Sequence, residues 1–295
     1  FFLGKKHGNF CEYNDNGILL KKIVYRNGLK HGLQLERYPS GKIKKRKFYK
    51  NGLPIGQHIC YYENDKKKTI VFFNKQNKPQ GYIKHFYESG NLKLLSYYNT
   101  QGQLHGESFE YYDHQGMLRK LEQYDNSKKV NQILEYYENG ALKSSLPLCN
   151  EKKDGVYFEF TKDGKEKKTI TYKDGLKHGL LTNYQNGNKF ETLNYYKDEL
   201  DGFQCHLNRK GYYDYYLYFI EGLFVLKKNI KEKSYGCVVC YEKTKWKTSC
   251  NHHFCLNCTK KSFYTSKKTC CPYCRNSFKE MKDEKFMFYN IFPYC

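Results

Sequence analysis

The sequence lacks any long apolar run. No stretch approaches the roughly 18 apolar residues that a membrane-spanning helix needs, so no transmembrane helix is expected. The first residues, FFLGKKHGNF, hold an apolar stretch that is far too short for a secretory signal. The chain also begins without Met, which is typical of a fragment or a processed form.

Aliphatic residues and proline are scarce, whereas aromatic residues are abundant. Apolar residues make up 39% of the chain, below a typical globular content of roughly 45–50%. Only six Pro and one Trp stand beside 31 Tyr and 20 Phe. So many aromatics argue against intrinsic disorder, because burying them offsets the entropy lost on ordering. We expect a folded chain with a thin core of large aromatic side chains.

Acidic residues are few, and cysteines are distributed unevenly. The 52 basic and 30 acidic side chains give a formal net charge of +22. Four of the 13 cysteines are scattered over the first 236 residues, and nine lie in the last 59. An odd total, one dense cluster and no secretory signal do not fit a disulfide framework. The pattern predicts a reduced, intracellular and cytoplasmic chain with a metal-binding module at one end.

A repeat of about 24 residues occupies the part before that module. Its leading position recurs every 23 to 25 residues, and a turn marker follows eight to ten residues later. Asn-Gly and Asp-Gly pairs at the turns supply the positive φ angles of tight hairpins. Between the turns, short runs rich in Tyr, Phe, Ile and Thr read as strands. The leading positions of the nine units are Gly8, Gly32, Gly56, Gly81, Gly106, Asn131, Gly155, Gly179 and Gly202.

Aromatic and histidine side chains recur at fixed positions of the repeat. Tyr or Phe stands five residues after most leading glycines, and again eight residues after most turn markers. Recurrence at one position predicts ladders of rings along the sheet. Each cross-strand aromatic pair stabilises a sheet by roughly 0.2–1 kcal/mol relative to an Ala–Ala pair. Four histidines precede leading glycines, so we expect turn or packing residues spread along a scaffold: His7, His31, His105 and His178.

The order Tyr-Tyr-x-x-Gly, then basic and apolar residues, then Asn-Gly-x-x-His-Gly, resembles the MORN-variant repeat. The likeness covers residues 3 to about 225. It implies a mainly β fold, an elongated antiparallel array of about nine hairpins over residues 1–225. The resemblance implies a scaffold for partners, and the family name, from membrane occupation and recognition, points to an anionic lipid surface. A linker over 226–236 would follow.

Four closely spaced ligand pairs lie in the segment from Cys237. Two residues between paired cysteines let both thiolates face one ion from a tight turn, and eight ligands fill two tetrahedral zinc sites. A short stretch cannot bury enough apolar surface to fold alone, so zinc would supply its folding energy. The pairs are Cys237 and Cys240, Cys250 and His252, Cys255 and Cys258, and Cys271 and Cys274.

Seven cysteines with histidine in fourth place resemble the RING finger, whereas a PHD finger would place histidine fifth. The resemblance covers residues 237–278 and implies a small α+β domain with two structural Zn²⁺ ions in a cross-brace. One ion would take Cys237, Cys240, Cys255 and Cys258; the other would take Cys250, His252, Cys271 and Cys274. His253 in place of His252, and Cys270 in place of Cys271, stay open as alternatives.

RING fingers recruit a ubiquitin-charged conjugating enzyme and promote transfer to a substrate lysine. By family pattern, Val239, Phe263 and Pro272 match the contacts with the conjugating enzyme, although the register of Phe263 is uncertain by one residue. Arg275, directly after the last ligand, resembles the linchpin that bridges ubiquitin and the conjugating enzyme, which suits the fork of an Arg side chain. Such catalysis is positional, so the chain needs no nucleophile or base of its own.

Three functions compete on this sequence. The favoured one is a RING-type ubiquitin ligase whose repeats select an unknown substrate or a location. The second is a non-catalytic zinc-finger adaptor. The third is binding of the basic repeats to anionic lipid or nucleic acid. Binding of nucleic acid is disfavoured because the positions of the aromatic residues in the repeat already explain their number. The basic runs are better explained as solvated charge at edges and turns, which prevents aggregation between sheets, than as a binding surface.

The last residues, 279–295, form an apolar tail whose role stays open between a homodimer interface and docking on the last repeat. The Lys-, Asn-, Tyr- and Phe-rich composition is typical of an AT-rich genome. The combination of repeats and a RING finger resembles proteins of large DNA viruses, which would place this chain in the host cytoplasm.

Overall fold

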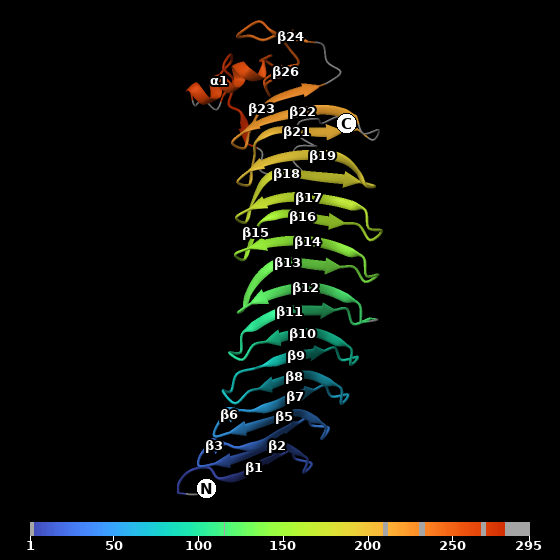
Figure 1. The fold of residues 1–295 in the computed structure, drawn as a ribbon, viewed down its shortest axis with the longest axis vertical. Helices are drawn as coiled ribbons and strands as arrows, with labels where there is room; N and C mark the ends of the chain where they lie inside the picture. Colours follow the sequence, from blue (N-terminus) through green and yellow to red (C-terminus); the bar gives the residue numbers. More distant parts are fainter. Residues whose placement is uncertain (1–2, 115, 209–211, 230–233, 267–269, 281–295) are drawn as a thin grey trace. The chain divides into compact units, whose positions relative to one another are not determined.

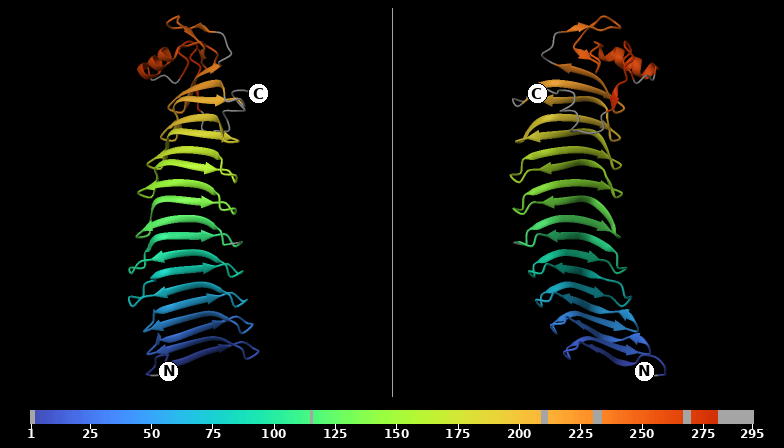
Figure 2. Two further views of the ribbon diagram at one scale, coloured as in Figure 1. Left: turned by 45° about the vertical axis from the view of Figure 1, so that its right-hand side comes forward. Right: turned by 180° about the vertical axis from the view of Figure 1, so that it is seen from behind.

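The computed structural model describes residues 3–114, 116–208, 212–229, 234–266 and 270–280. It is mainly β, with one described helix, and divides into two compact units at residues 151 and 152. In each unit the strands of the repeats, which end at residue 229, follow one another as antiparallel hairpins in chain order, as predicted (Figure 1). The views in Figure 2 show the hairpins of unit 1 as a single layer.

Unit 1 contains the strands β1 (Gly8–Tyr13), β2 (Leu19–Arg26), β3 (Leu29–Lys30), β4 (Gly32–Arg37), β5 (Ile43–Lys50), β6 (Leu53–Pro54), β7 (Gly56–Tyr61), β8 (Lys67–Phe73), β9 (Gly81–Phe86), β10 (Leu92–Tyr98), β11 (Leu104–Tyr111), β12 (Leu118–Asp125), β13 (Lys128–Tyr136) and β14 (Leu142–Cys149).

Unit 2 contains β15 (Lys152–Lys153), β16 (Gly155–Phe160), β17 (Glu166–Lys173), β18 (Leu176–Gln185), β19 (Asn188–Tyr196), β20 (Glu199–Leu200), β21 (Gly202–Leu207), β22 (Tyr213–Ile220), β23 (Leu223–Asn229), β24 (Tyr235–Gly236), β25 (Lys243–Thr244), β26 (Trp246–Lys247), α1 (Leu256–Ser266) and β27 (Lys279–Glu280).

The turns explain the spacing of the repeat. Asn27 and Gly28 have φ angles of 50° and 82°, the left-handed pair that a two-residue hairpin requires. The Gly28 N–H donates to the Lys6 carbonyl at 2.7 Å, and the Gly52 N–H donates to the Lys30 carbonyl at the same distance. Each turn amide therefore ties its hairpin to the hairpin before it.

A row of tyrosine hydroxyls links successive hairpins of unit 1 at the opposite turns. Each hydroxyl donates to a backbone carbonyl of the next repeat, 23 or 24 residues further along the chain. The four bonds run from Tyr38 to Tyr61, Tyr62 to Phe86, Tyr87 to Tyr111 and Tyr112 to Tyr136, at 2.8, 2.8, 2.8 and 2.9 Å. The Tyr at this repeat position, which is the second Tyr of a Tyr-Tyr pair at Tyr62 and Tyr112, thus serves as a staple between repeats.

Removing one hydroxyl tests this staple. We expect Tyr62→Phe to destabilise the turn that it joins by about 0.5–1.5 kcal/mol, the usual net value of one hydrogen bond. Hydrogen exchange of the amides around Phe86 should become faster, with Tyr82→Phe, whose ring is 56% exposed, as the matched control. Equal exchange in both variants would contradict the staple.

Lysine side chains cover several of the aromatic rings that recur in the repeat. The Lys two residues before the leading glycine places its ammonium over the Tyr of the same hairpin, as Lys30 does over Tyr49 at 5.3 Å and Lys177 over Tyr195 at 4.7 Å. Such cation–π contacts contribute about 0.5–1 kcal/mol at exposed sites. The Lys of the Lys-His-Gly motif therefore has a packing role.

The last hairpin, β22–β23, separates two hydrophobic cores within unit 2. Leu217 and Phe219 face a core that the repeats form, whereas Tyr218 and Ile220 face a second core with the cysteine-rich segment. Alternate residues of a strand point to opposite faces, so this strand is buried on both sides. The linker expected over 226–236 begins inside β23, and its residues 230–233 lie outside the described residues.

Candidate metal centre

Two groups of four ligands gather in the cysteine-rich segment. Within each group, every ligand atom lies within 4.8 Å of the others. The groups interleave along the chain, as a cross-brace requires: Cys237, Cys240, Cys255 and Cys258 in one, and Cys250, His252, Cys271 and Cys274 in the other. These are the two sets that the RING resemblance implied.

The distances between ligand atoms suit a tetrahedral zinc ion. With Zn–S bonds of about 2.3 Å, two thiolates on one tetrahedron lie about 3.8 Å apart. Cys240 Sγ and Cys255 Sγ are 3.6 Å apart, and Cys250 Sγ and Cys274 Sγ are 3.4 Å apart. A disulfide bond would need about 2.05 Å, so these are separate thiols. The donor set therefore fits zinc, with all four positions taken and none open for water.

The second group assigns the histidine. His252 Nδ1 lies 3.3 Å from Cys250 Sγ and 3.7 Å from Cys271 Sγ. The neighbouring His253 stacks its ring on Tyr235 at 4.2 Å instead, and Cys270 lies outside both groups. The structure therefore gathers His252 and Cys271 and leaves out the two alternatives.

Tight turns position the ligands. Tyr241, Asn251 and Arg275 each follow a ligand cysteine directly and have φ angles of 61°, 66° and 61°. The Tyr241 N–H donates to the Cys237 carbonyl, and the Arg275 N–H to the Cys271 carbonyl, both at 2.9 Å. A side chain in this left-handed region costs energy, which a bound ion would offset. In the sequence, only the close spacing of the ligand pairs indicates these strained positions.

Backbone amides favour the thiolate of Cys237 in the first group. Burial opposes ionisation of Cys237, but backbone hydrogen bonds from Cys240, Cys255 and Val239 outweigh it and lower the pKa of the thiol to about 6. The Val239 N–H lies 3.5 Å from Cys237 Sγ. Metal binding requires the thiolate, so this environment prepares the ligand.

The module shares its core with the repeats of unit 2. Phe254, Phe263 and Cys271 pack with Tyr218 and Ile220 of β22, and Phe254 is fully buried. β26 and β27 also pair with β23 in antiparallel register. The metal-binding segment is therefore built onto the last hairpin.

The expected contacts with a conjugating enzyme differ in exposure. Val239 is 54% exposed, and Pro272 and Arg275 are also exposed. Phe263 is only 7% exposed and lies in the shared core, because one side of α1 packs against β22. Its neighbour Tyr264, which is 61% exposed, lies within the one-residue uncertainty of the register.

Two exposed tyrosines beside the ligands were missed by sequence reasoning. Tyr241 is 84% exposed, and Tyr273, whose ring lies 4.7 Å from that of His252, is 67% exposed. Their places next to or within Cys-x2-Cys pairs are the signal that could have revealed them. Together with Val239 and Pro272, they give the ligand loops an apolar surface.

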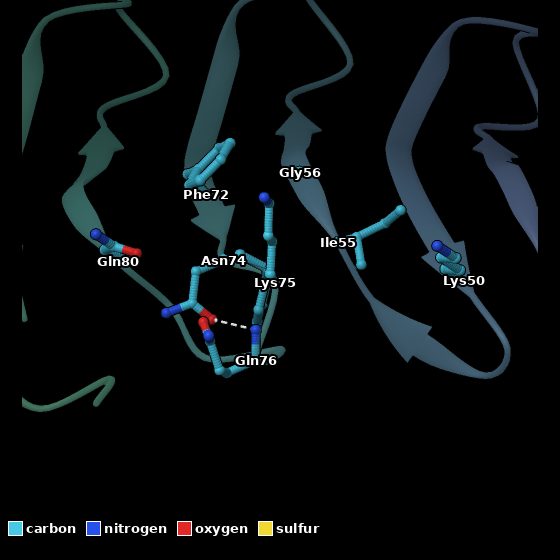
Figure 3. Close-up of a pocket in the computed structure, with 9 residues that line it drawn as sticks. Lys50, Ile55, Gly56, Phe72, Asn74, Lys75, Gln76 and Gln80 are labelled. Carbon is cyan, nitrogen blue, oxygen red and sulfur yellow. Dashed lines mark hydrogen bonds between the residues drawn. The ribbon is translucent and has the colours of Figure 1, made fainter. Parts of the chain in front are cut away.

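A groove of about 670 Å³ in unit 1 is not a candidate active site. Its lining combines Lys50 and Phe72 with the amides of Asn74, Gln76 and Gln80 (Figure 3). Asn74 Oδ1 accepts a hydrogen bond from the Gln76 N–H at 3.0 Å, so the side chain stabilises its own turn. The charged residues of the lining are Lys50 and Lys75, and the lining includes no acidic residue or histidine that could act as a base beside them.

The comparisons with known proteins identify the repeats. Three segments match the model of the MORN repeat variant, at residues 6–27, 30–51 and 79–100. The chain contains MORN-variant repeats. These matches lie within unit 1 and do not reach the metal centre. A search of curated proteins finds no match to this sequence.

Solved structures similar to the chain include a TcdB2–TccC3–Cdc42 crystal structure and a Photorhabdus luminescens Tc holotoxin pore. They are 12% and 11% identical, cover 76% and 81% of this chain, and have a TM-score of 0.18 each. This chain spans only 15% and 18% of the length of those chains. Structural similarity this low supports no conclusion about the MORN-variant repeats or the metal centre.

No helix in the described ranges has the length and hydropathy of a membrane span.

Proposed function

We propose that this protein is a RING-type ubiquitin ligase that binds two structural Zn²⁺ ions. The observation that supports it best is the pair of interleaved four-ligand groups whose loops expose Val239 and Pro272. Full coordination leaves zinc a structural role, so the reaction chemistry would stay with the thioester of the conjugating enzyme. The chain would hold that enzyme and its ubiquitin in a reactive orientation.

Named residues take separate roles in this proposal. Val239 and Pro272 would contact the conjugating enzyme, with Tyr264 replacing Phe263 on α1, because Phe263 lies in the core. Arg275 is exposed and directly follows a ligand, as the linchpin role requires. The MORN-variant repeats would select a protein substrate in the cytoplasm, where ubiquitin and conjugating enzymes are available.

The test is a ubiquitination assay of the full chain with activating enzyme, ubiquitin and a broad panel of conjugating enzymes. We expect wild-type protein to form ubiquitin chains with at least one of them, and Val239→Ala to form them at least tenfold more slowly. Arg275→Asn should also form chains slowly, because it removes the guanidinium group of the linchpin. Asn tolerates positive φ, so the turn should be kept. Arg275→Lys, which restores a positive charge, should recover part of the rate.

Zinc content measured on the same samples separates loss of function from loss of fold. All variants should retain two zinc ions per chain, and Leu29→Ala, at a 50% exposed position in unit 1, should behave as wild type. A zinc-loaded wild type that forms no chains with any conjugating enzyme would refute the ligase. The burial of Phe263 would then favour the adaptor, in which the module only joins partners.

Binding of anionic lipid by the basic repeats has weaker support. Many of the lysines involved already have partners, such as Lys68 over Tyr62 at 5.2 Å and Lys45 with Glu36 at 2.7 Å. These contacts support a packing role for the charge. The lipid hypothesis would need salt-sensitive binding to anionic vesicles.

A further inference from the structure

The groove in unit 1 lies where β5 and β8 end and where β7 and β9 begin (Figure 3). Its volume of about 670 Å³ falls within the range of about 300–1,000 Å³ that is usual for ligand-binding clefts. Its apolar lining includes Ile55 and Phe72, and Phe72 is 49% exposed. All of its lining residues are described, whereas most of the apolar tail, residues 281–295, lies outside the described residues.

A long turn forms one wall of the groove. The turn after β5 is a two-residue turn in which Asn51 and Gly52 have φ angles of 52° and 82°. The turn after β8 is longer, because its Asn74 N–H donates to the Lys78 carbonyl at 2.9 Å. The extra residues of this turn separate it from the turn after β5 and leave the space between them open.

The side chain of Asn74 fixes this longer turn. Asn74 is buried, and its Oδ1 accepts hydrogen bonds from the N–H groups of Gln76 and Lys78, both at 3.0 Å. Its Nδ2 donates to the Thr100 carbonyl of the next repeat at 2.8 Å. The turn is therefore tied to its neighbour, and Lys75 and Gln76 are held beside the groove.

Four polar side chains of the lining have no partner among the described residues. No described residue forms an ion pair, hydrogen bond or ring contact with the ammonium groups of Lys50 and Lys75. The side-chain amides of Gln76 and Gln80 are equally free of described partners. The Lys75 side chain extends along the groove beside Phe72 (Figure 3). These groups are available to an external ligand.

The charge around the groove is of one sign. Residues 66–87 contain six lysines and no Asp or Glu. The nearest acidic residues before them are held by the neighbouring turn, since Ser40 donates to Glu63 at 2.9 Å and Lys42 pairs with Asp65 at 3.0 Å. A cleft lined by free ammonium groups without carboxylates attracts an anionic ligand.

The shape of the surface suits an extended ligand. β5, β7, β8 and β9 are successive neighbours in the sheet, so the groove crosses three strand steps, about 14 Å. Four extended residues span the same distance. Ile70 pairs with Lys84, and this register places Phe72 opposite the exposed Tyr82, which extends the aromatic surface onto β9.

We propose that the groove binds an acidic peptide segment of a partner protein. Carboxylates of the segment pair with Lys50 and Lys75, and an apolar side chain packs on Phe72. The free amides of Gln76 and Gln80 bond the backbone of the segment. A role of this partner as the ubiquitination substrate rests on the proposed function, whereas the binding itself does not.

A library of random seven-residue peptides, presented to the full, zinc-loaded chain, tests the proposal. We expect the selected peptides to be rich in Asp and Glu and to contain an aromatic or aliphatic residue. Fluorescence anisotropy with the tightest selected peptide then gives dissociation constants. The double variant Lys50→Glu and Lys75→Glu should bind it at least tenfold more weakly, and Phe72→Ala at least threefold more weakly.

A matched double variant separates a site from general attraction to a basic chain. Lys67→Glu with Lys128→Glu makes the same charge change at two exposed positions outside the groove, so it should bind the peptide within twofold of wild type. Equal weakening in the two double variants would overturn the proposal. Selected peptides without acidic residues would overturn it as well.

Two further outcomes are distinguishable. A single-stranded oligonucleotide that binds through Lys50 and Lys75, while no peptide binds, would overturn the proposal and assign the groove to nucleic acid. The binding measurements need no ubiquitin or conjugating enzyme. A chain that binds the peptide but forms no ubiquitin chains would therefore support the groove and refute only the ligase.

Discussion

Cys271→Ser should reduce the zinc content from two ions per chain to at most one and unfold the metal-binding module. Cys271 is fully buried, belongs to the second ligand group and packs in the core shared with β22. Structural zinc contributes about 10–16 kcal/mol of apparent binding free energy in small zinc-dependent domains, so losing one ion exceeds what a small core can replace. Elemental analysis measures the zinc, and Trp246 fluorescence reports the fold.

The adjacent cysteine provides a matched control. Cys270 is half-buried and lies outside both ligand groups, so Cys270→Ser should retain two zinc ions and the native fluorescence. The two variants make the same chemical change one residue apart. The reverse result, with zinc lost from Cys270→Ser and kept in Cys271→Ser, would show that the ligand assignment is wrong.

Local chemistry explains why the sequence predicted the repeat and the ligand groups. A turn that needs positive φ selects glycine or asparagine, so Gly28 and its equivalents appear at a fixed spacing. Metal ligands must be cysteine or histidine at short spacing, so Cys237 and Cys240 are visible in one chain segment. Both features depend on residues close together in the sequence.

The features that the sequence did not predict depend on residues far apart in it. The Tyr62 hydroxyl bonds a carbonyl 24 residues away, and Phe263 is buried by Tyr218, 45 positions earlier. Whether an aromatic residue faces solvent or a core depends on which element packs on it, and periodicity does not report this. Lysines over tyrosine rings were missed for the same reason.

The last repeat also carries a sequence signal for the second core of unit 2. The run YYLYFI in β22 and LFVL in β23 is the most continuous apolar stretch of the last repeat. Strands buried on both faces show such continuous apolar runs. The sequence therefore did contain a sign that something covers the second face of this hairpin.

Val225→Asp should disrupt the hairpin and the metal-binding module together. Val225 is fully buried in β23 and packs in the core with Phe254 and Phe278. An unpaired carboxylate in this core costs several kcal/mol, because no partner replaces the water that it loses. We expect zinc content to fall and hydrogen exchange of β22 to become faster in the full chain.

The result distinguishes two architectures. If the module folded independently after a linker, a charge at Val225 would destabilise the last repeat and leave two zinc ions bound. Because Cys271 and Phe254 share their core with β22 and β23, the zinc content should fall as well. Leu176→Asp, at a 41% exposed position of β18, should leave the zinc content unchanged. Retention of both ions in Val225→Asp would show that the module does not need the hairpin for its stability.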